Sequence, residues 1–309
     1  MLKGKDLLSI HDLSRDEVEE IIDCAAKLKI MQKAGVEHKI LAGKTLGMIF
    51  EKSSTRTRVS FEVGIFQLGG TGLFLSSKDL QLGRGEPIKD TARVLARYLD
   101  GIMIRTYEQA KVEELAKYAD IPVINGLTDL LHPCQVLTDL LTIREHKGKN
   151  FRALKMAYVG DGNNMTNSYL YGAAKVGMTL TVATPADYKP NLKVFENALA
   201  DAEETGAKLS WTENPAEAVH DADIIATDTW ASMGQEAEHD ARKKIFAPYQ
   251  VNKNLLSGAS KNVIVLHCLP AYRGEEITDD VLEDNAHVIF DEAENRLHTQ
   301  KAIMALTMG

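Results

Sequence analysis

The sequence predicts an α/β protein of two domains, each a parallel sheet with helices on both faces. Its 309 residues suffice for two domains with a core each. Short apolar runs of strand length alternate with longer helix-like segments, which is the pattern of parallel sheets. The runs form two series, separated near residues 148–150, so we expect one sheet on each side of this boundary.

The first series begins with a helix. Ser14 and Glu17 predict its start, because they fit a capping box followed by residues that form an apolar helix face. Strands and helices then alternate along the chain. The expected strands are Thr45–Phe50, Thr71–Leu75, Gly101–Arg105 and Ile121–Asn125, and the expected helices are Thr57–Leu68, Pro87–Leu99, Glu108–Ala119 and Pro133–Lys147.

The second series supplies the strands of the other sheet. They are expected at Lys155–Val159, Thr179–Ala183, Lys208–Trp211, Asp223–Thr227, Val263–His267 and His287–Phe290, with helices between them. We therefore expect one domain over residues 1–148 and another over 149–294. A last helix, at about 295–309, is expected to pack back on the first domain.

Composition narrows the class of protein. The 44 acidic and 36 basic residues give a net charge of −8, which argues against a general nucleic-acid surface. Three widely separated cysteines are no disulfide framework and favour a reducing cytoplasm. The first residues lack the apolar stretch of a signal peptide, and no run of about 18 apolar residues occurs, so we expect neither secretion nor membrane insertion.

The turn at residues 53–58 is the most informative segment, because it combines four hydroxyls with Arg56 and Arg58 between a strand and a helix. Helix N-termini favour anions, hydroxyls can cap the helix or donate to phosphate, and arginine can bind phosphate through two hydrogen bonds. An ordinary capped helix start with solvated arginines is the alternative. The turn lacks the glycines and lysine of a P-loop, and we expect it to bind a small phosphorylated ligand.

Other polar residues follow the expected strands, where open parallel sheets bind their ligands. Arg105 ends an apolar strand and needs a partner that a bound anion would supply. Pro133 suits the first turn of a helix, which places His132 at its cap and Gln135 in its first turn. A purely capping role for His132 is an equal alternative at this point. A last polar group, Asp291 to Arg296, follows the expected strand at residues 287–290.

The second series has its own polar loops. Gly160 and Gly162 invite a dinucleotide-binding interpretation, but Met165 stands where a third glycine is required. Asn163 and Asn164 fit a pocket for a carboxylate or serve as helix caps. Asp228, with the hydroxyls and glycine of residues 229–234, suits an ammonium group, although such loops are frequent.

Cysteine and histidine residues raise the question of a metal. Cys268 follows an expected buried strand, and we expect its thiol to be partly buried. Most such cysteines only fill space in the core. A zinc set of His132, Cys134, His267 and Cys268 lacks the close spacings of structural zinc sites. We therefore expect no metal.

These motifs, in this order, resemble the aspartate/ornithine carbamoyltransferase family over essentially the whole chain. The family shares a Ser-Thr-Arg-Thr-Arg phosphate loop, at 54–58 here, and a His-Pro-x-Gln segment, at 132–135 here. The His-Cys-Leu-Pro segment at 267–270, with Asp228 and Ser-Met-Gly at 232–234, is similar to the members that act on ornithine. The resemblance implies transfer of the carbamoyl group of carbamoyl phosphate to the δ-amine of L-ornithine, giving L-citrulline and phosphate without a cofactor.

The resemblance also implies a role for each matching residue. Residues implied to bind carbamoyl phosphate are Ser54, Thr55, Arg56, Thr57, Gln81, Arg105, His132, Gln135, Cys268, Leu269 and Arg296. Those implied to bind ornithine are Asn164, Asp228, Ser232 and Met233, and those implied to be catalytic are Arg105, His132 and Cys268. The family further implies a homotrimer in which Gln81, on the loop at 76–86, reaches a neighbouring subunit's site.

Two alternatives stay open on the sequence. The chain could carbamoylate another amine such as putrescine, or it could be a non-catalytic paralogue that binds the same ligands. Arg56, Arg105, His132, Gln135 and Cys268 are all present, and groups aimed at the reacting carbonyl favour an enzyme.

Overall fold

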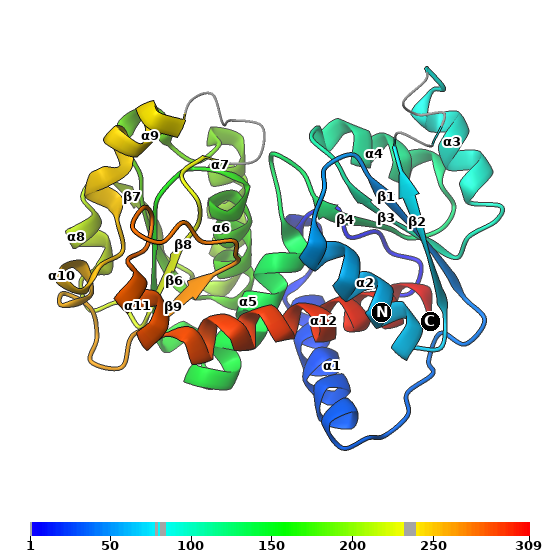
Figure 1. Cartoon of the computed structure of the whole chain (residues 1–309), viewed down its shortest axis with the longest axis horizontal. Helices are drawn as coiled ribbons and strands as arrows, with labels where there is room; N and C mark the ends of the chain where they lie inside the picture. Colours follow the sequence, from blue (N-terminus) through cyan, green and yellow to red (C-terminus); the bar gives the residue numbers. More distant parts are fainter. Residues whose placement is uncertain (1, 78–79, 81–84, 232–238) are drawn as a thin grey trace. The chain divides into compact units, whose positions relative to one another are not determined.

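The computed structural model describes the whole chain except residues 1, 78–79, 81–84 and 232–238. It divides into two compact units (Figure 1). The first comprises Met1–Leu141 with Asn295–Gly309, and the second comprises Thr142–Glu294. The division falls inside helix α5 (Pro133–Lys147), ahead of the boundary expected after residue 148. It also falls inside the last helix, α12 (Ala286–Met308).

The first unit is built on a four-stranded parallel sheet in the order β2-β1-β3-β4. The strands are β1 (Thr45–Phe50), β2 (Thr71–Ser76), β3 (Gly101–Arg105) and β4 (Val123–Leu127). Helices α3 (Ile88–Leu95) and α4 (Gln109–Tyr118) pack an apolar core onto one face. Helices α1 (Arg15–Lys33), α2 (Thr55–Gln67) and the end of α12 lie on the other face (Figure 1).

Helix α2 packs closely on the end of α12. A β-carbon at Gly64 would lie 3.0 Å from the Met304 methyl carbon and 3.3 Å from Lys301 Cγ, so a glycine allows this approach. Helix α1 begins as expected, because Ser14 and Glu17 form the capping box.

The second unit is built on a five-stranded parallel sheet in the order β7-β6-β5-β8-β9. The strands are β5 (Lys155–Val159), β6 (Thr179–Ala183), β7 (Leu209–Thr212), β8 (Ile224–Thr227) and β9 (Ile264–His267). Helices α6 (Asn164–Val176) and α7 (Leu192–Thr205) lie on one face (Figure 1). On the other face, an apolar core joins the sheet to α8 (Pro215–Val219), α9 (His239–Phe246), α11 (Asp279–Asp284) and the start of α12.

Short elements complete the described chain. They are α10 (Lys253–Leu256) and the 3₁₀ helices η1 (Ile10–Asp12), η3 (Phe151–Ala153), η4 (Ala186–Tyr188) and η6 (Ala247–Tyr249). None of the described helices combines the length and apolarity that a membrane crossing requires.

The fold class expected from the sequence is confirmed, with one wrong element. Residues 287–290 form the first turns of α12 instead of a strand, so Arg296 is a helical residue and does not follow a strand. A four-residue apolar run fits a buried strand or a buried helix equally well. Here Val288 and Ile289 are buried while Phe290 is exposed, as one face of a helix requires.

Both sheets reverse their strand order next to their first strand, which is where such sheets bind ligands. In the first unit, β1 lies between β2 and β3, and Phe50 pairs with Arg105 at the carboxyl edge. In the second unit, β5 lies between β6 and β8, and Thr227 pairs with His267 at the same kind of edge. The polar loops predicted from the sequence follow these strand ends.

Candidate functional site

The turn after β1 is held as a helix N-terminus. Ser54 is the N-cap of α2, and its Oγ accepts the backbone N–H of Thr57 at 3.2 Å and approaches Thr57 Oγ1 at 3.1 Å. Thr57 is buried, whereas Arg56 is half-buried and Ser53 and Thr55 are exposed. The first helical turn contains no acidic residue, so the positive end of the helix is not neutralised locally.

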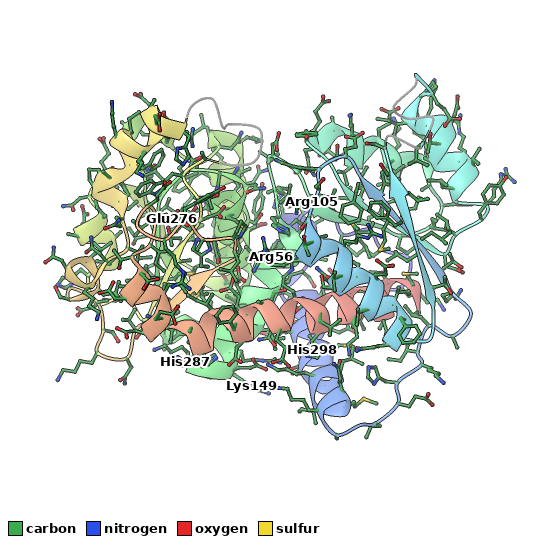
Figure 2. The ribbon with its side chains drawn as sticks, viewed as in Figure 1. Arg56, Arg105, Lys149, Glu276, His287 and His298 are labelled. Carbon is green, nitrogen blue, oxygen red and sulfur yellow. The ribbon has the colours of Figure 1, made fainter. Side chains whose placement is uncertain are left out.

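Two buried guanidinium groups meet at the Thr57 hydroxyl. Arg105, at the end of β3, donates from Nη1 to Thr57 Oγ1 at 3.4 Å, and Arg296 of α12 donates from Nη2 to the same oxygen at 3.2 Å. These contacts are at the long end of the hydrogen-bond range, so a stronger acceptor would compete for the same donors. Figure 2 shows Arg56 on α2 near Arg105 in this unit.

Gln135 is fixed on the first turn of α5. Arg296 Nη1 donates to Gln135 Oε1 at 2.5 Å, and Gln135 Nε2 donates to Asp139 Oδ1 at 2.8 Å. All three side chains are buried. The amide orientation is therefore set by an arginine on one side and a carboxylate on the other, which leaves the amide little rotational freedom.

His132 lies buried ahead of α5 among these arginines. Burial lowers the pKa of His132 well below its usual value, and the charges of Arg296, Arg105 and Arg56 lower it further. The imidazole is consequently neutral at physiological pH, with one N–H to donate and one lone pair to accept. The arrangement gathers positive charge and a neutral hydrogen-bond donor around one place, which suits an anion joined to a polarisable carbonyl.

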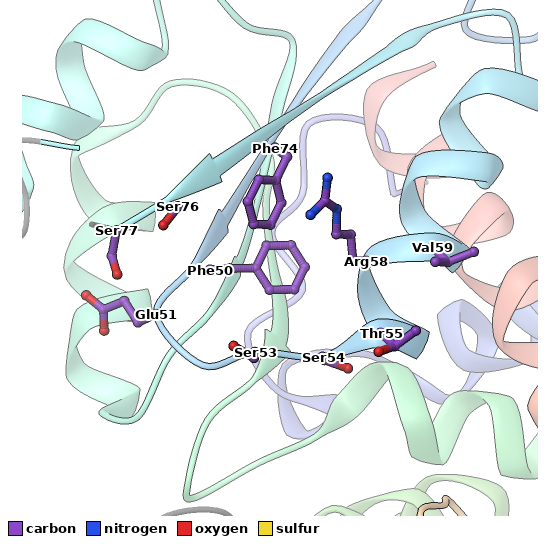
Figure 3. A pocket seen from close by; sticks show the side chains of 10 residues that line it. All are labelled: Phe50, Glu51, Ser53, Ser54, Thr55, Arg58, Val59, Phe74, Ser76 and Ser77. Atoms are coloured by element: carbon purple, nitrogen blue, oxygen red, sulfur yellow. The ribbon is translucent and has the colours of Figure 1, made fainter. Parts of the chain in front are cut away.

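A pocket of about 530 Å³ adjoins the outer side of the turn (Figure 3). Its lining is Phe50, Glu51, Ser53, Ser54, Thr55, Arg58, Val59, Phe74, Ser76 and Ser77. The Arg58 guanidinium stacks over the Phe74 ring at 3.8 Å and pairs with Glu62 at 3.3 Å. Arg58 therefore contacts Phe74 of the pocket and Glu62 of α2, while Arg56 is the arginine of the turn whose charge acts on His132.

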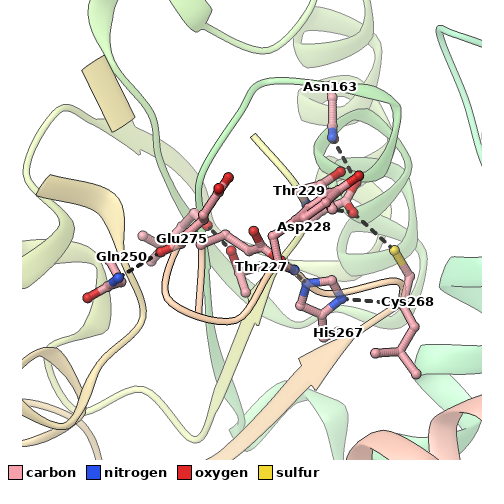
Figure 4. Close-up of polar contacts among 12 residues, drawn as sticks. Asn163, Thr227, Asp228, Thr229, Gln250, His267, Cys268 and Glu275 are labelled. Carbon is pink, nitrogen blue, oxygen red and sulfur yellow. Dashed lines mark hydrogen bonds and ion pairs between the residues drawn. The ribbon is translucent and has the colours of Figure 1, made fainter. Parts of the chain in front are cut away.

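In the second unit, Asp228 is the centre of a hydrogen-bond network after β8 (Figure 4). Asn163 Nδ2 donates to Asp228 Oδ2 at 2.9 Å, and the Thr229 backbone N–H donates to Asp228 Oδ1 at 2.8 Å. The thiol of Cys268, after β9, donates to Asp228 Oδ1 at 3.2 Å. Asp228 thus lies beside the thiol with its carboxylate held in place from three sides.

Asn163 is the N-cap of α6, because its Oδ1 accepts the backbone N–H groups of Met165 and Thr166. Asn164 is the first helical residue and is half-buried. The sequence placed both asparagines at this pocket and favoured Asn164. In the structure it is Asn163 that contacts Asp228, and Asn164 occupies the adjoining position at the helix start.

A buried ion pair supports the loop before α6. Arg242 of α9 contacts Asp161 through Nη2 and the Trp230 carbonyl through Nε. Burial raises the pKa of Asp161 to about 6, although the charge of Arg242 acts in the opposite direction. The sequence does not predict this pair, because Arg242 and Asp161 are 81 residues apart in the chain.

The described residues contain one group that could resemble a metal site: Asp228, His267 and Cys268, whose potential ligand atoms lie within 4.8 Å of one another. His267 does not fit such a site, because its Nδ1 accepts the Leu269 backbone N–H at 2.9 Å and its Nε2 lies 2.9 Å from Glu276 Oε1. A neutral imidazole engaged at both nitrogens has no lone pair left for a metal.

Cys134, the other thiol of the zinc set weighed from the sequence, is fully buried. Burial raises the pKa of the Cys134 thiol to about 12, and its Sγ donates to the Asn125 carbonyl at 3.3 Å. Cysteine binds metals as the thiolate, and a thiol with a raised pKa is poorly suited to that role. Cys134 is therefore a core residue.

The structure brings together most residues that the sequence singled out. Arg105, Thr57, Gln135 and Arg296 are linked by hydrogen bonds, and Asp228 and Cys268 are linked likewise. Gln81, Ser232 and Met233 lie outside the described residues. Sequence reasoning missed Asp139 and Glu276; Asp139 follows Gln135 by one helical turn, a spacing that could have suggested it.

Comparisons with known proteins give a consistent result over both units. Residues 5–145 match the family model described as the carbamoyl-P binding domain of aspartate/ornithine carbamoyltransferase, and residues 152–307 match its Asp/Orn binding domain. A protein of Carboxydothermus hydrogenoformans named ornithine carbamoyltransferase is 60% identical over 307 residues, which cover 99% of this chain and 98% of that protein.

Solved structures agree with these sequence matches. Ornithine carbamoyltransferase from Pyrococcus furiosus is 54% identical with a TM-score of 0.96, and the match covers 100% of this chain and 98% of that one. The anabolic ornithine carbamoyltransferase from Campylobacter jejuni is 45% identical with a TM-score of 0.91, and the match covers 97% of each chain.

Proposed function

This chain belongs to the aspartate/ornithine carbamoyltransferase family, and from that premise we propose how its residues make citrulline. The enzyme transfers the carbamoyl group of carbamoyl phosphate to the δ-amine of L-ornithine, giving L-citrulline and phosphate. The observation that carries the residue assignment is the convergence of Arg105 and Arg296 on Thr57, beside the neutral His132. This arrangement fits a phosphate joined to a carbonyl.

The first unit binds carbamoyl phosphate in this proposal. The phosphate accepts hydrogen bonds from Ser54, Thr55 and Thr57 at the N-terminus of α2, and Arg56 adds a charge-assisted contact. Helix dipole and arginine both favour a dianion at this position. Arg296, which already reaches Thr57, contributes positive charge from α12.

The carbonyl oxygen of carbamoyl phosphate is bound by Arg105, His132 and Thr57. Attack by an amine converts this carbonyl into an oxyanion, and donors aimed at that oxygen stabilise the developing charge; one such donor is worth about 10²–10³ in rate. Gln135 Oε1 and the backbone of Leu269 hold the carbamoyl NH₂. The fixed amide of Gln135 supports this role, because Arg296 and Asp139 orient it before substrate binds.

The second unit binds ornithine. Asp228 and Ser232 pair with the α-ammonium group, and Asn164 with the backbone of Met233 binds the α-carboxylate. Cys268 lies beside the reacting δ-amine. The contacts of Asp228 with Asn163 and Cys268 support this arrangement, because they hold one carboxylate oxygen toward each neighbour.

The chemical step balances without a redox change or a metal. The δ-amine, as the neutral base, attacks the carbonyl carbon; a C–N bond forms, the carbon–oxygen bond to phosphate breaks, and the amine loses a proton. Asp228, Cys268 and the leaving phosphate are the groups that can handle that proton. The positive charge around Ser54 to Thr57 stabilises phosphate as it departs.

Citrulline formation by the purified protein tests the proposal. We expect a colorimetric assay to detect citrulline only when carbamoyl phosphate and ornithine are both present. Putrescine tested in parallel should be carbamoylated far more slowly, because it lacks the α-carboxylate that the second unit binds in this proposal. Faster turnover of putrescine would contradict the ornithine assignment, and carbamoyl phosphate binding without any product would identify a non-catalytic paralogue.

We also propose that the enzyme is a homotrimer, or a multiple of trimers, in the cytoplasm and serves arginine metabolism. An exposed apolar surface supports self-association: Val59, Val63 and Phe66 lie along one face of α2, and Phe66 is 76% exposed. A partner subunit covering this surface would remove it from water. The neighbouring pocket at Arg58 and Phe74 would then adjoin the partner, which fits a contribution from the partner's Gln81.

A further inference from the structure

A fully buried histidine–glutamate pair lies directly behind the Cys268 loop. His267 Nε2 and Glu276 Oε1 are 2.9 Å apart, and both side chains have no exposed surface. Figure 4 shows His267 beside Cys268, and Figure 2 labels Glu276 in the same unit. Burying a carboxylate is costly unless its partners compensate, so this pair is an unusual element of a core.

The hydrogen-bond pattern fixes the tautomer of His267. The Leu269 backbone N–H donates to His267 Nδ1 at 2.9 Å, so Nδ1 must carry the lone pair. In a neutral imidazole the proton then resides on Nε2, which donates to Glu276 Oε1. A protonated imidazole would present an N–H to the Leu269 N–H and break this contact.

Glu276 also holds the loop directly. Its Oε1 accepts the Tyr272 backbone N–H at 2.7 Å in addition to His267. The backbone N–H of His267 donates to Glu292 Oε2 at 2.9 Å, so the start of the loop is fixed as well. The chain from residue 267 to 272 is therefore held at its start, at Leu269 and at its end by buried carboxylates and one imidazole.

Leu269 needs this support because of its backbone. Its φ of +57° is in the left-handed region, which is unfavourable for a leucine. The hydrogen bond from Leu269 N–H to the imidazole helps hold that conformation. The residue before it, Cys268, then directs its thiol to Asp228 Oδ1 at 3.2 Å. A small change in the Leu269 backbone would move both the thiol and the Leu269 carbonyl.

We propose that Glu276 is a positioning residue for carbamoyl transfer: acting through the His267 imidazole, it sets the backbone of Leu269 and thereby the place of the Cys268 thiol. The inference rests on the proposed function, since it assigns Glu276 to the same site. Glu276 touches no substrate in this account. Its effect is on the orientation of groups that do, and misplacement by about 1 Å can cost about 10²-fold in rate.

Two substitutions of Glu276 separate positioning from simple burial. Glu276→Leu removes the acceptor, so we expect kcat/KM for ornithine to fall by about 10- to 100-fold. The Kd for carbamoyl phosphate should change less, because only the Leu269 backbone contact is displaced while the proposed phosphate contacts of the first unit remain. Glu276→Gln keeps a carbonyl oxygen for the His267 imidazole and the Tyr272 backbone N–H. Its NH₂ takes the place of Glu276 Oε2, an atom with no hydrogen-bond partner among the described residues. This variant should retain kcat/KM for ornithine within about threefold.

The neighbouring Glu275 supplies a matched control. It pairs with His239 at 3.1 Å and Lys243 at 3.1 Å, away from Leu269, so Glu275→Gln should leave both constants unchanged. A second readout is the alkylation rate of Cys268, followed by peptide mass spectrometry. Glu276→Leu should change this rate and Glu275→Gln should not, whereas a merely stabilising role of Glu276 would leave the thiol of the folded protein unaffected.

The outcomes distinguish the two proposals. If the native protein makes no citrulline, the proposed function fails. If it makes citrulline but folded Glu276→Leu matches it in ornithine kcat/KM and in Cys268 alkylation, the positioning role is wrong. Should Glu276→Leu not fold, His267→Asn decides: its Oδ1 can still accept the Leu269 N–H, but the link to Glu276 is cut. Native kinetics in His267→Asn would overturn the proposal.

Discussion

Burial lowers the pKa of His132 well below its usual value, and the charges of three neighbouring arginines lower it further. A neutral imidazole can donate one N–H to a carbonyl oxygen without adding a fourth positive charge to the cluster. The arginines supply the charge and the histidine supplies a directed donor. Arg56 differs from Arg58 in this respect, since Arg58 is engaged with Phe74 and Glu62.

Arg56→Ala tests the charge at the phosphate turn. We expect the Kd for carbamoyl phosphate to rise and kcat to fall by about 10²-fold, because a charge-assisted contact to the leaving group is lost. Calorimetric titration and steady-state citrulline assays measure the two effects. Arg93→Ala, which removes an exposed arginine paired with Asp90 on α3, is the control. Near-normal kinetics of Arg56→Ala would refute its phosphate role.

Cys268→Ser tests the thiol. A serine hydroxyl can still donate to Asp228 but is smaller and less polarisable, so we expect a higher KM for ornithine, a lower kcat or a shifted pH profile. The affinity for carbamoyl phosphate should change little. Cys24→Ser, on the half-buried cysteine of α1, is the matched control. If none of these parameters moves, Cys268 is packing and has no part in the reaction.

Helices α1, α2 and α12 meet at a buried lysine that the reaction does not use. Lys301 Nζ contacts Gln32 Oε1 at 2.7 Å, His38 Nε2 at 3.0 Å and Gln67 Oε1 at 2.9 Å. The side chain is fully buried, and burial lowers the pKa of Lys301 to about 8. These contacts join α12 to both helices that pack beside it in the first unit.

This lysine predicts a pH dependence of stability. An unfolded lysine titrates near pH 10.4, so between about pH 8 and 10 the unfolded chain binds more protons than the native one at this position. The free energy of unfolding contributed by Lys301 therefore increases with pH across that window. Urea titrations at several pH values measure the free energy of unfolding of the native protein and of Lys301→Met. The difference between the two should show this increase with pH. A difference that stays constant from pH 8 to 10 would contradict the buried charge.

The elements were predictable where local chemistry agrees with the fold. The bounds of β1, β3, β5, β6 and α5 are confirmed to the residue, because apolar runs flanked by glycine, proline or polar turns define them. The strand expected at residues 287–290 was wrong, because a short apolar run carries no periodicity. The division of the two compact units falls after Leu141, inside the continuous helix α5, and no sequence feature indicates it.

For the molecule as a whole, the sequence predicted candidate site residues but not the buried residues that orient them. Arg296 contacts Gln135 and Thr57 from helix α12 of the first unit, whereas the sequence had placed it after a strand of the second domain. The burial of Glu276 and Arg242 was not predicted, because charged residues in a polar stretch of sequence are usually exposed to solvent. Only the fold shows which of these charges are buried.

Assembly gives a prediction for the whole molecule. Phe66→Glu places a charge on the exposed apolar face of α2, so we expect the proposed homotrimer to dissociate toward monomers. Light scattering after size-exclusion chromatography measures the mass, and Glu113→Lys on α4 is a surface control. A native protein that is already monomeric, or a variant of unchanged trimeric mass, would show that this face is not the interface.

Transfer of labelled carbon tests the central claim most directly. Carbamoyl phosphate labelled with ¹³C at the carbonyl is incubated with ornithine and the enzyme, and the products are followed by ¹³C and ³¹P NMR. We predict one labelled ureido carbon of citrulline for each phosphate released, and no accelerated phosphate release without ornithine. Phosphate released without labelled citrulline, or no consumption of carbamoyl phosphate, would contradict the account.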